Sequence, residues 1–247
     1  MTRLAVGLSL VLLLVTPLFA QSDPQAVTYA MQATSALTGA NPIMDTTLIG
    51  TATRTVGSDQ GSGPTTLYAK SQFASRIDMN LSSGNRSEIR NSVPSPQGEW
   101  IGSDGTPTQY ALHNCYTDPA WFFPALSSLA SANNPNEILS YVGLETLNGS
   151  SVQHIRSVWS GQPLSTMDFY LDATTLLPVE IDFNAHPDDN MAVNVSFQIL
   201  FSDYQNVGGA LVPYHVQELL SGTVLLDFTA SSAALNTGLS DSLFAIQ

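Results

Sequence analysis

Residues 192–201 read AVNVSFQILF, and this stretch decides the fold class. Apolar and polar side chains alternate along it, with Val193, Val195, Phe197, Ile199 and Phe201 on one side and Asn194, Ser196 and Gln198 on the other. Because successive side chains of a strand point to opposite faces, the alternation indicates a β-strand with one apolar face. Such strands are typical of an antiparallel sheet that has one face in water.

The segments on both sides of this stretch also read as strands. Asn148-Gly149 separates two strand-like runs, and this dipeptide is a strong hairpin signal. A turn at residues 172–175 separates two more runs. Further strands are expected at residues 44–56, 65–81, 87–93, 99–102, 108–112, 138–147, 151–159, 166–171, 179–183, 211–220 and 224–230. Residues 57–64, GSDQGSGP, are expected to form a loop because of their composition.

Two helices are expected to cover the apolar face of this sheet. Asp23-Pro24 begins the first, since a carboxylate cap followed by proline is typical of a helix N-terminus, and Gly39 ends it. Residues 120–131 are expected to form the second. The helical spacing of the first helix appears in Ala26, Tyr29, Ala30, Ala33 and Leu37. We therefore predict a mainly β (α+β) fold, a curved half-barrel antiparallel sheet wrapped around one N-terminal and one central helix.

The first twenty residues are expected to be a targeting signal. Arg3 provides a positive start, an apolar run follows, and Ala20 precedes a polar stretch, which is the pattern of a secretory signal peptide. We predict that residues 1–20 are a signal peptide and that residues 21–247 form one domain without a membrane span. No cysteine follows the expected cleavage site, so we expect no lipid anchor there. The predicted location is the periplasm or the medium of a bacterium.

Composition narrows the class of protein further. Only 11% of the 247 residues are charged, and 7 basic against 20 acidic residues give a net charge of −13. This charge makes nucleic acid or an anionic membrane surface an unfavourable partner. The single cysteine, Cys115, cannot form an intramolecular disulfide. A domain of this length must therefore be stabilised by its apolar core.

Three segments resemble the lipoprotein-carrier superfamily of exported bacterial proteins, the LolA/LppX-like fold. Residues 169–178, FYLDATTLLP, resemble its strand and "D-x-T-x-L-P" turn with one residue inserted, and residues 203–213, DYQNVGGALVP, resemble its "Y-x-x-V-x-G-x-x-x-P" connection. Residues 239–244, LSDSLF, resemble its usual ending. Upstream of residue 168 the likeness is one of layout. The resemblance implies a half-open antiparallel barrel around helices, and several members bind an acyl chain or a lipid between the two.

Motifs for catalysis and metal binding are weak. The segment His186-Pro187-Asp188-Asp189-Asn190 is similar to the "H-P-D-D-E" segment of zinc-dependent de-N-acetylases, but its position between two strands favours a simple turn. His113, His154 and His215 fall in no ligand-spaced motif, and the chain has no Gly-x-Ser-x-Gly segment. We predict no catalytic residue, no metal and no cofactor.

The most suggestive feature is a set of aromatic and apolar side chains that would line a cavity between sheet and helices. The candidate residues are Trp100, Trp121, Phe122, Phe123, Leu126, Trp159, Phe169 and Phe197. We expect non-catalytic binding of a hydrophobic small molecule, a lipid or an acylated protein. The alternative is a protein-interaction or sensor module with a fully packed core. A hydrolase would need convergent Asp and His side chains, which the sequence does not identify.

Overall fold

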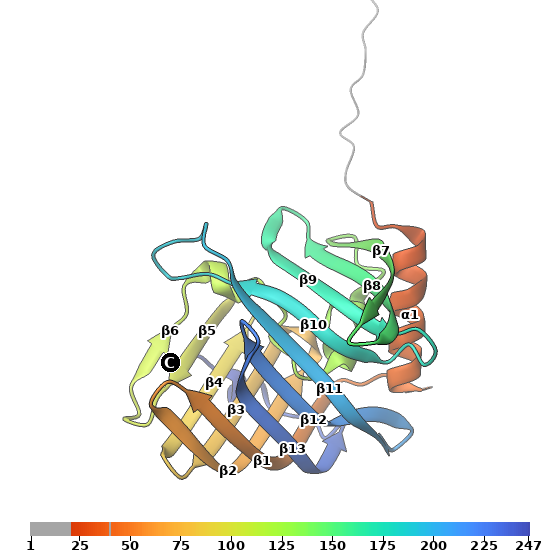
Figure 1. Ribbon diagram of the computed structural model, residues 1–247. Helices are drawn as coiled ribbons and strands as arrows, with labels where there is room; N and C mark the ends of the chain where they lie inside the picture. The colour runs from red at the N-terminus through yellow and green to blue at the C-terminus, as the bar shows by residue number, and fades with distance from the viewer. Residues whose placement is uncertain (1–20, 40) are drawn as a thin grey trace, which may run out of the picture.

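The computed structural model describes residues 21–39 and 41–247, so the expected signal peptide lies outside the described residues. Thirteen strands form one antiparallel sheet in the order β6-β5-β4-β3-β2-β1-β13-β12-β11-β10-β9-β8-β7 (Figure 1). The chain therefore runs outward from β1 to one edge at β6, restarts at the other edge with β7, and returns to pair β13 with β1. Because β6 and β7 are not paired, the curved sheet is an open half-barrel, as predicted.

Most strand bounds are close to the expected ones. The run expected at residues 65–81 is instead two strands, because a 3₁₀ turn at Ser71–Phe73 divides it, and the strand expected at residues 108–112 ends at Gln109. The first half contains β1 Asp45–Val56, β2 Asp59–Lys70, β3 Ala74–Leu81, β4 Gly84–Asn91, β5 Gln97–Ile101 and β6 Pro107–Gln109. The second half contains β7 Glu137–Leu147, β8 Ser150–Trp159, β9 Gln162–Asp172, β10 Pro178–Ala185, β11 Val195–Val207, β12 Ala210–Leu220 and β13 Thr223–Leu235. The alternating stretch lies in β11, where Ile199 and Phe201 are buried, and the hairpin at Asn148-Gly149 joins β7 to β8.

The loop expected at residues 57–64 is wrong, because most of this segment belongs to strand β2. Arg54 and Gly61 are directly paired in the hairpin of β1 and β2. A Cβ atom on Gly63 would stand 2.0 Å from the carbonyl oxygen of Asn80. Glycine is therefore present here because the neighbouring strand approaches closely, and not because the chain turns.

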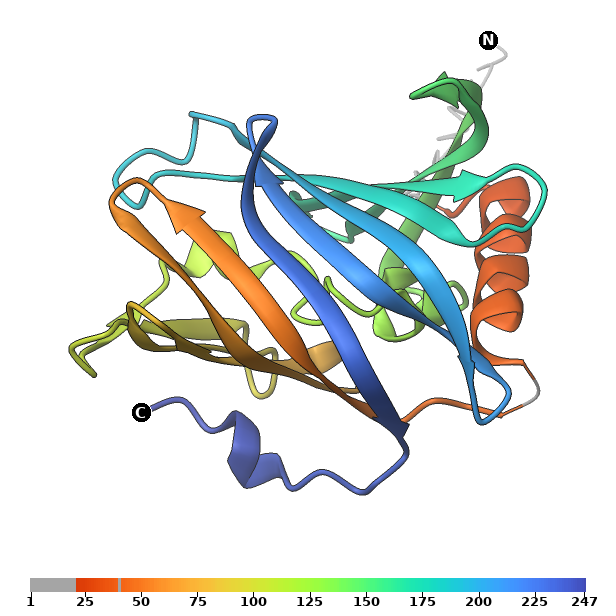
Figure 2. The ribbon, with the colours of Figure 1, turned by 60° about the horizontal axis from the view of Figure 1, so that its bottom comes forward.

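The N-terminal helix α1, Pro24–Thr38, begins and ends as its sequence predicts. The side chain of Asp23 accepts a hydrogen bond of 2.7 Å from the backbone N–H of Gln25, and Gly39 follows the last turn with φ 62°. Its buried stripe consists of Ala26, Ala30, Ala33 and Leu37. Small alanine side chains let the helix lie close to β7, β8 and β12 at one end of the half-barrel (Figure 2).

The central segment is helical in short pieces. Instead of one helix over residues 120–131, two 3₁₀ turns form, η3 Pro124–Leu126 and η4 Ser128–Ser131, inside the concavity of the sheet (Figure 2). The Asp118 carboxylate accepts hydrogen bonds from the backbone N–H (2.7 Å) and hydroxyl (2.9 Å) of Ser128. These contacts, together with Pro124, favour tight turns over a continuous helix.

Three more 3₁₀ turns are found in the connections, η1 Ser71–Phe73, η2 Leu112–Cys115 and η5 Asp241–Phe244. The last belongs to the C-terminal segment, which packs against β3 and β4 on the outer face of the sheet. Arg76 donates a hydrogen bond to the Leu243 carbonyl at 3.2 Å, and the backbone N–H of Gln247 donates one to Glu99 at 3.1 Å. Within the described part of the chain, no helix has the length and apolar character needed to cross a membrane.

Candidate functional site

Two adjoining cavities lie on the concave face of the half-barrel, beyond the part that α1 covers. Their volumes are about 280 Å³ and about 200 Å³. Both are lined by Glu88, Tyr110, Phe197 and Glu218, which therefore stand where the two cavities meet. The apolar wall of the larger cavity includes Val56, Ile77, Met79, Trp100, Leu225 and Leu226.

Sheet register explains why these side chains share one face. Glu88 on β4 is paired with Ile77 on β3 and with Trp100 on β5. Glu218 on β12 is paired with Leu226 on β13, which is paired in turn with Arg54 on β1. Directly paired residues point to the same side of a sheet. Two charged side chains from opposite halves of the chain are thereby placed on the apolar face.

The environment of the two carboxyl groups shifts their ionisation. Burial raises the pKa of Glu218 to about 8, and the nearby Glu88 adds to the rise, while Arg54 and Arg90 oppose it. Burial also raises the pKa of Glu88, against the lowering effect of Arg90, Arg54, Tyr110 and Trp121. Enclosure among apolar side chains disfavours the charged form of a carboxyl group. At pH 7 most Glu218 side chains are therefore protonated.

Arg90 connects strand β4 to the segment that follows β6. It is only 5% exposed, and its guanidinium donates to the carbonyl oxygens of Asn114 (3.0 Å), Thr117 (3.2 Å) and Asp118 (3.3 Å), and to the Thr117 hydroxyl (2.9 Å). Its Nε atom is buried without a hydrogen-bond partner. Most donors of Arg90 are thus committed to holding the wall of the smaller cavity.

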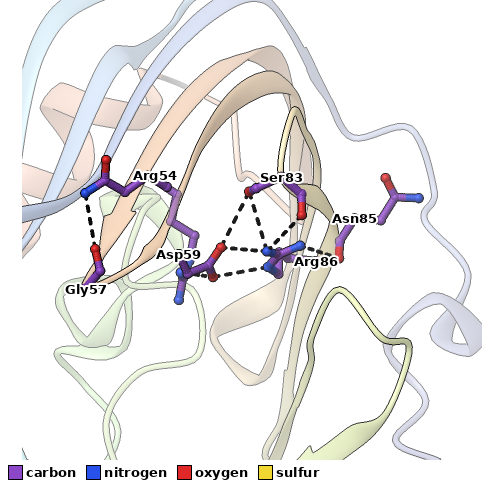
Figure 3. A network of polar contacts seen from close by, with 7 residues as sticks. Arg54, Gly57, Asp59, Ser83, Asn85 and Arg86 are labelled. Carbon is purple, nitrogen blue, oxygen red and sulfur yellow. Dashed lines mark hydrogen bonds and ion pairs between the residues drawn. The ribbon is translucent and has the colours of Figure 1, made fainter.

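Arg54 and Arg86 share one carboxylate at the rim of the half-barrel (Figure 3). Asp59 accepts from Nη1 of Arg54 and from Nη2 of Arg86, both at 2.6 Å. Hydrogen bonding by Arg86 is the main cause that lowers the pKa of Asp59. The guanidinium carbon of Arg54 lies 4.7 Å from the ring centroid of Trp100, in the geometry of a cation–π contact. Arg54 and Trp100 therefore form a fixed part of the cavity wall.

The structure separates the eight candidate residues from the sequence into three groups. Trp100 lines the larger cavity, Trp121 lines the smaller one, and Phe197 lines both. Trp159 lines another cavity of about 310 Å³, together with Cys115 and Asp118. The remaining four are buried in the core and line neither concave cavity: Phe122, Phe123, Leu126 and Phe169.

Sequence reasoning missed the charged members of the site. Glu218 follows Val212, Tyr214 and Val216 at every second position of β12, so it is a charged residue on an otherwise apolar face. That interruption was the available signal. Arg86, Glu88 and Arg90 are likewise two positions apart on β4, but three charged residues in alternation read as a solvent-facing strand.

Two other polar groups lie apart from the concave cavities. His186 belongs to the connection between β10 and β11, where its Nδ1 atom is 3.0 Å from the Val193 carbonyl, and this segment is the turn that the sequence favours. On the outer face, His215 lies 2.9 Å from the Ser202 hydroxyl through Nδ1 and 2.9 Å from Asp227 through Nε2. None of these residues lines either cavity. Among residues 21–39 and 41–247, no group of three His, Cys, Asp or Glu side chains converges on a metal position.

An open antiparallel half-barrel with cavities on its concave face defines the class of this protein. Comparison with solved structures identifies the fold as LolA-like. A domain assigned to outer membrane lipoprotein sorting in Vibrio parahaemolyticus matches with a TM-score of 0.59 at 10% identity, over 89% of this chain and 96% of its own. A LolA superfamily protein from Nitrosomonas europaea matches with a TM-score of 0.55 at 11% identity, over 90% and 97%.

A DUF1329 family protein from Desulfovibrio piger also matches, with a TM-score of 0.59 at 11% identity over 91% of this chain and 98% of its own. No family model and no curated protein matches the sequence. At such low identity the likeness concerns the fold, and the function must be argued from the site.

Proposed function

We propose that this protein is an exported, non-catalytic binding protein that holds the apolar part of a lipid or acyl chain against the concave face of its half-barrel. The observation that carries the proposal is the pair of adjoining cavities that meet at Phe197. The LolA-like fold and the signal peptide expected from the sequence support it. Solved structures with this fold include proteins described as lipoprotein-sorting and LolA superfamily members.

The walls of the cavities favour an apolar chain. Burying one methylene group contributes about 0.8 kcal/mol, so a chain that fills the space between Ile77, Leu226 and Phe197 gains several kcal/mol. Ligand pockets commonly have volumes of about 300–1,000 Å³, and each cavity alone lies below this range. A single-chain ligand that spans both cavities fits better than one with several chains.

The test is native mass spectrometry of residues 21–247, purified without detergent and then offered single-chain amphiphiles. We expect near-stoichiometric uptake, and we expect Leu226→Trp to abolish it, because the new ring fills the larger cavity. Leu144→Trp is the matched control, since Leu144 is 61% exposed on β7, and it should bind like the wild type. Thermal unfolding shows whether each variant folds, and Leu225→Trp replaces Leu226→Trp if the latter does not.

A second candidate function, a protein-interaction module, is favoured by the free edge of the sheet. Strand β7 is an edge strand. Its first residues are covered, since the backbone N–H of Asp23 donates to the Leu139 carbonyl at 2.8 Å. Beyond them, Val142 and Leu144 are 47% and 61% exposed. Such an edge can accept a strand from a partner. An apo mass with no uptake of any amphiphile would contradict the binding proposal and leave this function in the lead.

A further inference from the structure

The polar side chains that line the cavities differ in how many hydrogen bonds they make within the protein. The guanidinium of Arg90 donates to four oxygen atoms, whereas Arg54 donates one hydrogen bond, to Asp59, and lies against the face of Trp100. By contrast, among the described residues no group donates a hydrogen bond to the Glu218 carboxyl, although it lines both cavities. Where the two cavities meet, the free hydrogen-bonding capacity of the carboxyl groups is therefore that of the Glu218 oxygens.

Ionisable groups of both signs line the cavity walls. The lining residues include two guanidinium groups, Arg54 and Arg90, and two carboxyl groups, Glu88 and Glu218. The adjoining Asp59 and Arg86 form an ion pair of their own. A bound anion would face two carboxyl groups, and a bound cation would face two guanidinium groups. In an enclosed site, each such unbalanced charge is costly.

We propose that the ligand is an uncharged amphiphile whose head group carries hydroxyl or amide donors, which bind the Glu218 carboxyl while the apolar chain lies against Trp100, Phe197 and Leu226. This inference rests on the binding function proposed above and names the ligand class for that site. A hydroxyl head group satisfies the Glu218 oxygens and adds no charge to the site. The raised pKa of Glu218 supports it, because a protonated carboxyl group can also donate a hydrogen bond to such a head group.

The experiment compares three ligands that have the same acyl or alkyl length and different heads: monodecanoylglycerol, decanoic acid and decylamine. Their affinities are measured by calorimetry at pH 7 for the wild type, Glu218→Gln and Glu218→Leu. We expect the wild type to bind monodecanoylglycerol at least about tenfold more tightly than either charged ligand, a difference of about 1.4 kcal/mol. Glu218→Leu should lose about tenfold in affinity for monodecanoylglycerol, and Glu218→Gln should retain it, because an amide still offers an acceptor.

The outcomes separate this inference from the proposal on which it rests. If decanoic acid or decylamine binds the wild type as tightly as monodecanoylglycerol, the binding function stands and the ligand class is wrong. If Glu218→Leu binds monodecanoylglycerol as the wild type does, Glu218 does not recognise the head group. If no ligand binds, both proposals fail. The comparison of head groups uses the wild type alone, so it does not depend on the folding of a variant.

Discussion

The two ends of the concave face are built in different ways. At one end, α1 and the central segment cover the concave side of β7 to β9, so that Leu139 on β7, Phe169 on β9 and Phe122 of the central segment are fully buried. At the other end, no helix formed by the described residues covers the sheet, and Glu88 and Glu218 stand among apolar residues beside two cavities. The concave face of a curved sheet must be covered by other side chains or bind a ligand. The candidate site lies at the end where the described helices do not cover it.

The largest expected effect comes from truncating one aromatic side chain at each end, which tests whether the two ends are packed differently. Phe169 is fully buried between Ile155 and Ile181 on neighbouring strands, so Phe169→Ala should lower the free energy of unfolding by about 3–5 kcal/mol. Phe197 is half-buried and lines the cavities, so Phe197→Ala should cost about 1–2 kcal/mol, mainly through its stacking on Phe183. Urea unfolding measures both, and equal losses would show that the two ends are packed alike.

A second prediction concerns how the open end is held from outside. Asp45, at the start of β1, accepts hydrogen bonds from the backbone N–H groups of Thr237 (2.7 Å), Gly238 (2.8 Å) and Leu239 (3.3 Å), which anchors the C-terminal segment. Burial acts to raise the pKa of Asp45, but these hydrogen bonds together outweigh it and lower the pKa below its usual value. Asp45→Ala should therefore cost about 2–3 kcal/mol at pH 7.

The pH dependence of this effect has a defined sign. A carboxylate with a lowered pKa in the folded state contributes stability above its unfolded pKa of 3.8, and this stability is lost as the pH falls through the lowered value. The difference between the wild type and Asp45→Ala should accordingly shrink in acid. Thermal unfolding from pH 7 down to pH 3 measures it. A constant difference over this range would mean that Asp45 acts through packing and not through its charge.

Local signals in the sequence predicted most of the fold. The alternation in β11, the Asn148-Gly149 hairpin and the cap at Asp23 each depend on neighbours along the chain, and each is found in the structure. The segment at residues 57–64 was misread because glycine serves turns and close strand contacts alike. The segment at residues 120–131 was expected to form one helix, but Pro124 and the hydrogen bonds of Ser128 to Asp118, ten residues earlier, favour two 3₁₀ turns, and the second of these contacts is not local in the sequence.

The candidate site was only partly predictable for a different reason. Trp100, Trp121 and Phe197 line the cavities as apolar residues would, so hydrophobicity identified them. Glu88 and Glu218 are far apart in sequence, and they meet only because β1 pairs with β13 and closes the two halves of the chain into one curve. Charge on a buried face can be detected along one strand, but its partner on a distant strand cannot be deduced without the topology.

The smallest predicted effect tests whether burial of a carboxyl group at the open end lowers the free energy of unfolding. Glu218 has a pKa of about 8 in the folded protein against an ordinary value of 4.5, so between these pH values the folded state holds a proton that the unfolded state has lost. Stability contributed by this group therefore falls as the pH rises from 4.5 to 8. Glu218→Gln removes the titration and should be more stable than the wild type by about 1–2 kcal/mol at pH 8 and equal to it at pH 4, a modest difference because the Glu218 side chain is only partly buried. Chemical unfolding of both proteins across this range measures the difference. Parallel curves for the wild type and Glu218→Gln would mean that the carboxyl group is well solvated, and that the open end of the half-barrel costs no more than the rest of the surface.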